Sequence, residues 1–141
     1  MVTEVKDSQA LATDLRPVLL RLNRELKREI HSLGVTGGQV SLLVSIKQRP
    51  GVTAKELAEL DRVSAAAMSV SLGRLEKGGL IERTRGEDRR CVSVTLSAAG
   101  EKVLRSVKQR RTAWLAARLK DLDDDDREAI DAALPALARL L

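Results

Sequence analysis

The near absence of aromatic side chains limits how this chain can build a core. Its 141 residues include one tryptophan and no phenylalanine or tyrosine, although 43% of them are hydrophobic. A core of this composition must consist of Leu, Ile, Val and Ala, which favours helices that pack through aliphatic stripes. The apolar content is that of a globular protein rather than a disordered chain. The composition therefore predicts one domain that is mainly α-helical.

A long amphipathic helix is predicted near the N-terminus. Apolar residues recur every three or four positions from Leu11 to Leu33, which is the spacing of one helix face. The helix should extend over about Ser8–Ser32, with a kink at Pro17, and Gly34 should end it.

Three further helix starts follow in the next part of the chain. Thr36, Thr53 and Ser64 each stand where an N-cap is expected. Gln39 and Glu56 lie three residues after the first two of these, which is the capping-box spacing. The sequence therefore predicts a helix after each of the three caps.

The second and third of these helices form a helix-turn-helix pattern. The shorter one should face inward through Leu57 and Leu60, and residues 61–63 make a tight turn into a helix over 64–77. The second helix of such a pair is the recognition helix of many DNA-binding proteins. The apolar residues on its inner face are Met68, Leu72 and Leu75.

A β-hairpin is predicted next. Residues 80–85 are expected to form one strand, and the alternation of Val92, Val94 and Leu96 indicates another. The loop between them carries acidic and basic residues around Gly86. A loop that only joined two strands would need a glycine and a polar residue, not several guanidinium groups. A hairpin after a helix-turn-helix is a winged helix, and this loop is then the tip of the wing.

Two helices are predicted in the C-terminal part. Ser97 caps a long helix, with apolar residues at helical spacing from Val103 to Leu119. The acidic run Asp123–Asp126 begins a last helix, since carboxylates suit the positive end of the helix dipole. Pro135 falls inside that helix and should distort it locally.

The net charge and the wing both favour DNA as the partner. The formal net charge of +5 suits a polyanion. The second helix of a winged helix can enter a major groove, while an arginine at the wing tip can reach a minor groove, where the negative potential is focused. Arg89 or Arg90 would be that arginine. Asp88 would pin an arginine, either in the loop or at Arg74 on the neighbouring helix.

The chain resembles the MarR family of bacterial winged-helix regulators. The segments SAAAMSVSLGRLEKGGLIER and DRRCVSVTLSAAG carry the resemblance, which covers nearly the whole chain. It implies a mainly α fold with a small β-hairpin wing over about 81–96. It also implies a homodimer, in which residues 1–35 and 98–141 supply dimerisation helices and residues 36–97 the winged helix-turn-helix, all within one integrated domain.

The same resemblance implies that the recognition helix and the wing bind double-stranded DNA at a pseudo-palindromic operator. The candidate contact residues are Ser64, Ala65, Ala66, Ala67, Ser69, Val70, Arg74, Arg85, Asp88, Arg89 and Arg90. The three alanines depart from the family pattern, and so does Val70, where an arginine is common. Alanine and valine can pack on thymine methyl groups but make no bidentate pair. We therefore expect more dependence on the wing and on DNA shape than usual.

Regulation is a further implication of the resemblance. A repressor that occludes a promoter is expected, although activation is compatible with the same features. The family often binds small anionic or aromatic effectors between the dimer layer and the winged helix. Here the candidate effector-binding residues are Arg24, Arg28 and His31. For His31, a polar residue near a helix C-terminus is the simpler interpretation.

Cys91 is the only cysteine. Two neighbouring arginines would favour its thiolate and suggest a redox-sensitive thiol. A small residue that fills a strand position is the simpler interpretation.

Two other classes of function compete with DNA binding. An enzyme is disfavoured, because one His, one Cys and no Tyr leave little acid–base chemistry, and no Gly-rich phosphate loop is present. We expect no catalytic residues, no metal site and no cofactor, since the aspartate run lacks the glycine and spaced ligands of a calcium loop. The alternative is a winged helix that binds proteins without specific DNA binding, and it would not require an arginine-bearing wing.

Membrane insertion is not expected either. No apolar run approaches the ~20 residues of a transmembrane helix, and the sequence has no apolar N-terminal segment of the secretory type. A cytoplasmic location is therefore predicted.

Overall fold

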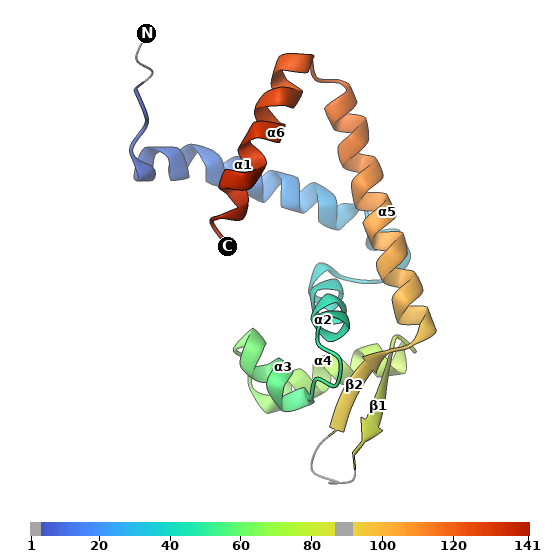
Figure 1. The fold of residues 1–141 in the computed structure, drawn as a ribbon. Helices are drawn as coiled ribbons and strands as arrows, with labels where there is room; N and C mark the ends of the chain where they lie inside the picture. The colour runs from blue at the N-terminus through green and yellow to red at the C-terminus, as the bar shows by residue number, and fades with distance from the viewer. Residues whose placement is uncertain (1–3, 87–91) are drawn as a thin grey trace.

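The computed structural model describes residues 4–86 and 92–141 of the chain. Within these ranges it is mainly helical, with one two-stranded antiparallel sheet (Figure 1). The predicted fold class, a winged helix-turn-helix between long terminal helices, is confirmed. The elements in chain order are α1 (Ser8–Arg28), the short 3₁₀ helix η1 (His31–Leu33), α2 (Gly37–Gln48), α3 (Ala54–Asp61), α4 (Ala65–Lys77), β1 (Ile81–Arg85), β2 (Val92–Leu96), α5 (Ala98–Lys120) and α6 (Asp124–Ala138).

Two layers of the molecule share one helix. In Figure 1, α2, α3, α4 and the hairpin form the lower body, whereas α1 and α6 lie in the upper layer. α5 starts at the root of the hairpin and continues into the upper layer. Its buried residues, Leu104 and Val107 among them, lie in its first half. α5 is thus part of the winged helix at one end and of the terminal layer at the other.

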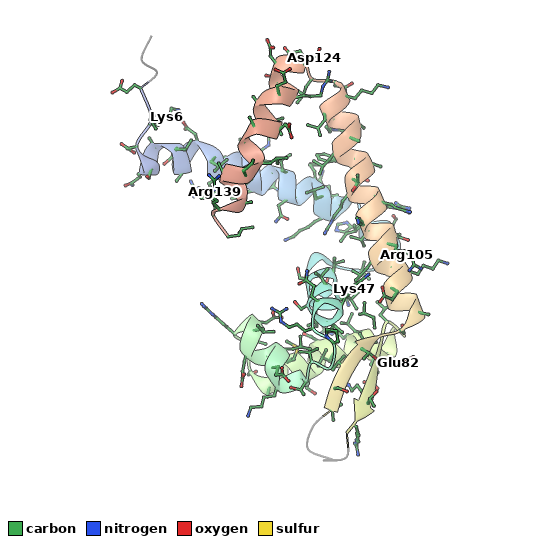
Figure 2. The ribbon with its side chains drawn as sticks, in the orientation of Figure 1. Lys6, Lys47, Glu82, Arg105, Asp124 and Arg139 are labelled. Atoms are coloured by element: carbon green, nitrogen blue, oxygen red, sulfur yellow. The ribbon has the colours of Figure 1, made fainter. Side chains whose placement is uncertain are left out.

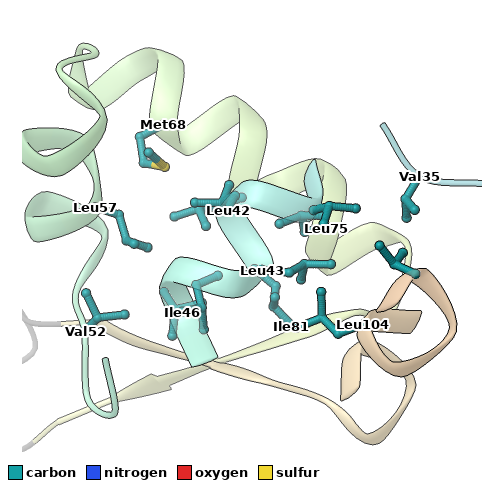
Figure 3. Packing of buried hydrophobic residues seen from close by; sticks show 14 of the residues in the cluster. Val35, Leu42, Leu43, Ile46, Val52, Leu57, Met68, Leu75, Ile81 and Leu104 are labelled. Atoms are coloured by element: carbon teal, nitrogen blue, oxygen red, sulfur yellow. The ribbon is translucent and has the colours of Figure 1, made fainter. Parts of the chain in front are cut away.

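The core lies in the winged helix and the first turns of α5 (Figure 3). α2 passes through its centre, and α3, α4, both strands and α5 each add side chains. Among the described residues, every buried side chain is aliphatic or methionine, as the composition predicts. The buried hydrophobic residues are Ile30, Val35, Val40, Leu42, Leu43, Ile46, Val52, Leu57, Ala58, Met68, Leu72, Leu75, Ile81, Val94, Leu104 and Val107.

The predicted N-caps are confirmed, with one difference in detail. Thr36 and Gln39 form a full capping box, in which each side chain accepts a hydrogen bond from the other residue's amide, at 3.1 and 3.0 Å. The Thr53 hydroxyl accepts from the Glu56 amide at 3.2 Å. The Glu56 carboxylate, however, accepts from the Thr53 hydroxyl at 3.0 Å rather than from its amide. The remaining caps are Ser64, Ser97 and Asp123.

The first helix ends earlier than predicted. α1 stops at Arg28 instead of Ser32, and the chain continues into the 3₁₀ turn of η1, which Gly34 ends with a φ of 75°. Ile30 lies between the two helices and is fully buried in the core. The α-helix thus ends just before Ile30, the residue at which the chain enters the core of the winged helix.

The expectation that Leu60 faces inward is wrong, because 46% of its surface is exposed. α3 buries Leu57 and Ala58 instead. At roughly 100° per residue, Leu60 lies about 110° from the middle of the face that these two residues define. Arg62, with a φ of 54°, ends the short helix directly afterwards.

The hairpin is attached to the helix-turn-helix at its root. β1 and β2 pair antiparallel, with Ile81 opposite Leu96. The segment before α3 adds to the same sheet, since the Val94 amide donates to the Val52 carbonyl at 2.9 Å. Ile81 and Val94 are both buried in the core. The wing therefore starts from a fixed position beside α3 and α4.

The start of α5 is joined to the segment that leaves α4. The Ser97 amide donates to the carbonyl of Leu80 at 3.0 Å, and the Ser97 hydroxyl donates to the carbonyl of Gly79 at 2.5 Å. The first strand was predicted to begin at Leu80, but β1 begins one residue later, at Ile81. A Cβ on Gly100 would lie 2.1 Å from the Leu80 carbonyl oxygen, so this approach requires glycine at position 100.

Gly100→Ala should destabilise the chain, because the Leu80 backbone would have to move. Overpacking of this kind costs about 1–3 kcal/mol, sometimes more. Gly73→Ala is the matched control, since a Cβ on this other helical glycine meets no atom within 4 Å. The control should stabilise the chain by about 0.5–1 kcal/mol. Urea unfolding at one protein concentration measures both substitutions, and equal effects would contradict the packing described.

Candidate nucleic-acid interface

The helix α4 buries one face and leaves the other open. Its inner residues Met68, Leu72 and Leu75 pack into the core. α4 also contacts β1, so its open face and the wing are neighbours. The predicted contact residues that the structure shows to be exposed are Ser64, Ala65, Ala66, Ala67, Ser69, Val70 and Arg74 on or at the start of α4, and Arg85 on β1.

The other predicted contacts are those that the sequence analysis assigns to the tip of the wing. Asp88, Arg89 and Arg90 lie outside the described residues, as does Cys91. What the sequence predicts for these four residues stays a prediction. Arg85, the last residue of β1, leads directly into this segment.

Ser64 has a structural role that restricts its part in recognition. Its hydroxyl oxygen accepts from the Ala67 amide at 3.0 Å, as the N-cap of α4. The hydroxyl proton can still be donated, but the helix determines where the oxygen lies. Ser69 and Arg74, the other polar candidates on α4, take no part in this cap.

An ion pair between α4 and β1 holds the wing against the recognition helix. Arg83 Nε lies 2.7 Å from Glu76 Oε2, and both side chains are partly exposed. A salt bridge of this kind contributes only about 0.2–1 kcal/mol, so it orients the wing more than it stabilises the fold. Sequence reasoning considered Arg74 for a helix-to-wing bridge and missed this pair. The signal was the position of Glu76 in the last turn of α4, shortly before an arginine-bearing strand.

Exposed cations lie at both ends of α4. Arg62 precedes α4 and Lys77 ends it, and both are exposed, as are Arg74 and Arg85. Sequence reasoning did not select Arg62 or Lys77, although both flank the predicted recognition helix. The exposed charges of α3 are mostly acidic: Glu56, Glu59 and Asp61, beside Lys55.

The residues predicted to bind an effector lie along and just beyond α1. Arg24 borders a shallow hollow of about 380 Å³, which is also lined by Val18, Arg21, Leu22 and Glu25. Arg28 Nη1 lies 3.5 Å from Glu25 Oε1. His31 is exposed at the start of η1. The hollow is formed by the surface of one helix, and Arg28 and His31 do not line it.

A second hollow, between α2 and α5, was not found from the sequence. Its volume is about 460 Å³, and Figure 2 labels Lys47 and Arg105, which border it from the two helices. Arg111 also lines it, and its Nε is buried without a hydrogen-bond partner among the described residues. Only the packing of α5 on α2 shows that Arg111 is enclosed, because the spacing of apolar residues along α5 gives no sign of it. The remaining lining residues are Val40, Val44, Leu104, Val107, Lys108 and Thr112.

Within residues 4–86 and 92–141, no three His, Cys, Asp or Glu side chains lie close enough together to hold a metal ion. No helix described there has the length and apolar character needed to span a bilayer.

Known proteins resemble this chain in sequence and fold. A sequence model of the family described as "MarR family" matches residues 35–92. The chain is 30% identical to the uncharacterized HTH-type transcriptional regulator Mb0904 of Mycobacterium bovis, over 96% of each chain. It is 28% identical to the HTH-type transcriptional repressor MdtR of Bacillus subtilis, over 86% of this chain and 82% of that one. The apo form of MarR from E. coli superposes with a TM-score of 0.72 at 25% identity, over 95% of this chain and 98% of that one.

Proposed function

The chain belongs to the MarR family and is a DNA-binding transcription regulator, and we propose that it acts as a homodimeric repressor of a pseudo-palindromic operator. The observation that carries the proposal is the open face of α4 beside an arginine-bearing wing, with the Arg83–Glu76 pair between them. The name of the B. subtilis relative supports repression. Occupancy of the operator would exclude RNA polymerase from an overlapping promoter.

The winged helix binds one half-site. The N-terminal half of α4 enters the major groove, and Arg89 at the wing tip enters the adjacent minor groove, with Asp88 as its orienting partner and Arg90 beside it. Exposed cations at the edge of this surface, Arg62 and Lys77, contact phosphates and set the register. The root of the hairpin is hydrogen-bonded to the helix-turn-helix, which supports recognition of both grooves by one unit.

A second copy of the chain covers the terminal helices. Leu11, Val18 and Leu22 on α1 are each at least 40% exposed, and so are Ile130 and Leu134 on α6. Apolar surface of this extent marks an interface. α1 and α6 lie in one layer away from the winged helix (Figure 1), so a dimer through residues 1–35 and 98–141 leaves both copies of α4 free. Its two-fold axis would match the symmetry of a palindromic operator.

An anionic effector would act at the hollow between α2 and α5. Arg105 and Arg111 supply positive charge there, beside apolar side chains, whereas the Lys47 ammonium group lies 3.0 Å from the Glu101 carboxylate. The hollow lies where the winged helix meets α5. A ligand bound there could favour dimers in which the two winged helices are spaced differently from the two half-sites. Such a ligand would lower the DNA affinity by population shift. Release of bound DNA by an aromatic carboxylate, and loss of that release in Arg111→Ala, would support this site over the one on α1.

Arg89→Ala should weaken binding to DNA from upstream of the chain's own gene, because a minor-groove contact is lost. The expected loss is about 1 kcal/mol or more in a gel shift across a salt series. Arg139→Ala is the control. It removes the same charge from an exposed residue at the C-terminal end of α6, in the upper layer away from the wing (Figure 2), and should change the affinity little.

Two results would contradict the proposed minor-groove contact of Arg89. Equal weakening by both substitutions would mean that Arg89 contributes charge but no specific contact. Weak binding that is indifferent to sequence and unchanged by either substitution would favour the alternative, a winged helix that binds proteins.

Leu22→Glu should dissociate the dimer, because a carboxylate would have to be buried at the interface. Glutamate retains the helix propensity of leucine, so α1 should persist. Sedimentation equilibrium should give twice the chain mass for the wild type and the chain mass for the variant. Leu60→Glu makes the same change at a leucine that is 46% exposed on α3, outside the proposed interface, and should remain dimeric. A monomeric wild type, or a dimeric Leu22→Glu variant, would contradict the proposed interface.

A further inference from the structure

The open face of α4 has few groups for hydrogen bonds to bases. Residues 64–73 include no Asn, Gln, Arg or Lys, the side chains that form bidentate pairs with adenine or guanine. The Ser64 hydroxyl oxygen is occupied as the N-cap. Ser69 and Ser71 are exposed, but a serine hydroxyl can bond to any base and discriminates little. Hydrogen bonding alone therefore gives this helix little means of selecting a sequence.

The same face presents apolar groups to solvent. Val70 is 56% exposed. Ala66 and Ala67 lie one turn before Val70 and are exposed as well, which places them beside it on the helix surface. Gly73 lies one turn after Val70, and a Cβ there would meet no atom within 4 Å. Val70 thus projects from a surface of very small side chains that lets the helix backbone approach a partner closely.

The charges around this apolar face indicate which partner it fits. Arg62, Arg74 and Lys77 are exposed at its edges, and the nearby Glu76 is paired with Arg83. A cationic border around an apolar centre is complementary to a DNA major groove, where phosphates form the rims. The apolar group that bases present in that groove is the C5-methyl group of thymine.

We propose that Val70, with Ala66 and Ala67 beside it, recognises C5-methyl groups of pyrimidines in the major groove. The inference rests on the proposed DNA-binding function and attributes the sequence specificity of DNA binding to these side chains. The recognition helix selects thymines through methyl contacts, while the wing and the phosphate contacts supply register and affinity. A 5-methylcytosine presents the same methyl group at the same place in the groove, so it should satisfy the contact as thymine does.

The test replaces methyl groups without changing base pairing. The wild-type chain first selects duplexes from a random-sequence library. Each thymine of the selected duplex is then replaced singly by deoxyuridine, which lacks only the methyl group. Deoxyuridine at one or more positions in the major-groove part of each half-site should weaken binding about fourfold, the factor that corresponds to ~0.8 kcal/mol for one buried CH₂ group. Deoxyuridine outside the two half-sites is the internal control and should change nothing.

A variant assigns the effect to Val70. Val70→Ala should bind the thymine and deoxyuridine duplexes with nearly equal affinity at the position that Val70 contacts, while discrimination at other positions persists. Because Val70 is exposed, the variant should keep the wild-type unfolding midpoint. Replacing the contacted thymine–adenine pair by 5-methylcytosine–guanine should weaken binding less than replacing it by cytosine–guanine.

The possible failures are distinguishable. If a selected duplex binds tightly and no deoxyuridine substitution within the half-sites changes its affinity, methyl recognition is wrong and the DNA-binding function stands. The assignment to Val70 is also wrong if Val70→Ala discriminates thymine from deoxyuridine as the wild type does. If the library yields no enriched sequence and no duplex is bound, the proposed operator-binding function fails, and the inference fails with it.

Discussion

The close approach of Gly100 to the carbonyl of Leu80 determines how the two layers of this protein are joined. With the hydrogen bonds of Ser97 to Gly79 and Leu80, it fixes the start of α5 against the chain that connects α4 to the wing. The aliphatic core then holds α2 between α4, the hairpin and the first half of α5. A displacement of the start of α5 would therefore be transmitted to the recognition helix and the wing.

This junction relates the dimer to DNA recognition. The upper part of α5 and the helices α1 and α6 carry apolar surface that the proposed second copy covers, whereas the lower part of α5 is packed into the winged helix (Figure 1). The distance between two recognition helices would thus depend on how the α5 helices of two copies are set against each other. A ligand between α2 and α5 would lie where α5 packs on the winged helix. The hollow lined by Arg111 is therefore the favoured effector site.

Local chemistry made much of the fold predictable, and tertiary contacts account for what the sequence did not predict. Thr36 and Ser64 were found because an N-cap depends on its own residue and the next three. Ile30 was placed in a continuing helix because nothing local shows that the chain must turn into the core. The Glu76–Arg83 pair joins a helix to a strand, and residue spacing within one element does not predict such a pair. For the site, the sequence located the exposed face of α4, but the enclosure of Arg111 depends on packing between α2 and α5.

In the proposed complex, the two winged helices of one dimer bind two adjacent half-sites of DNA. Hydroxyl-radical footprinting of the wild-type chain on DNA from upstream of its own gene tests this arrangement directly. Two symmetric protected regions are expected, with centres about one helical turn, ~10 base pairs, apart, flanked by protection where the wings enter the minor groove. A single asymmetric footprint, or uniform weak protection along the fragment, would contradict it.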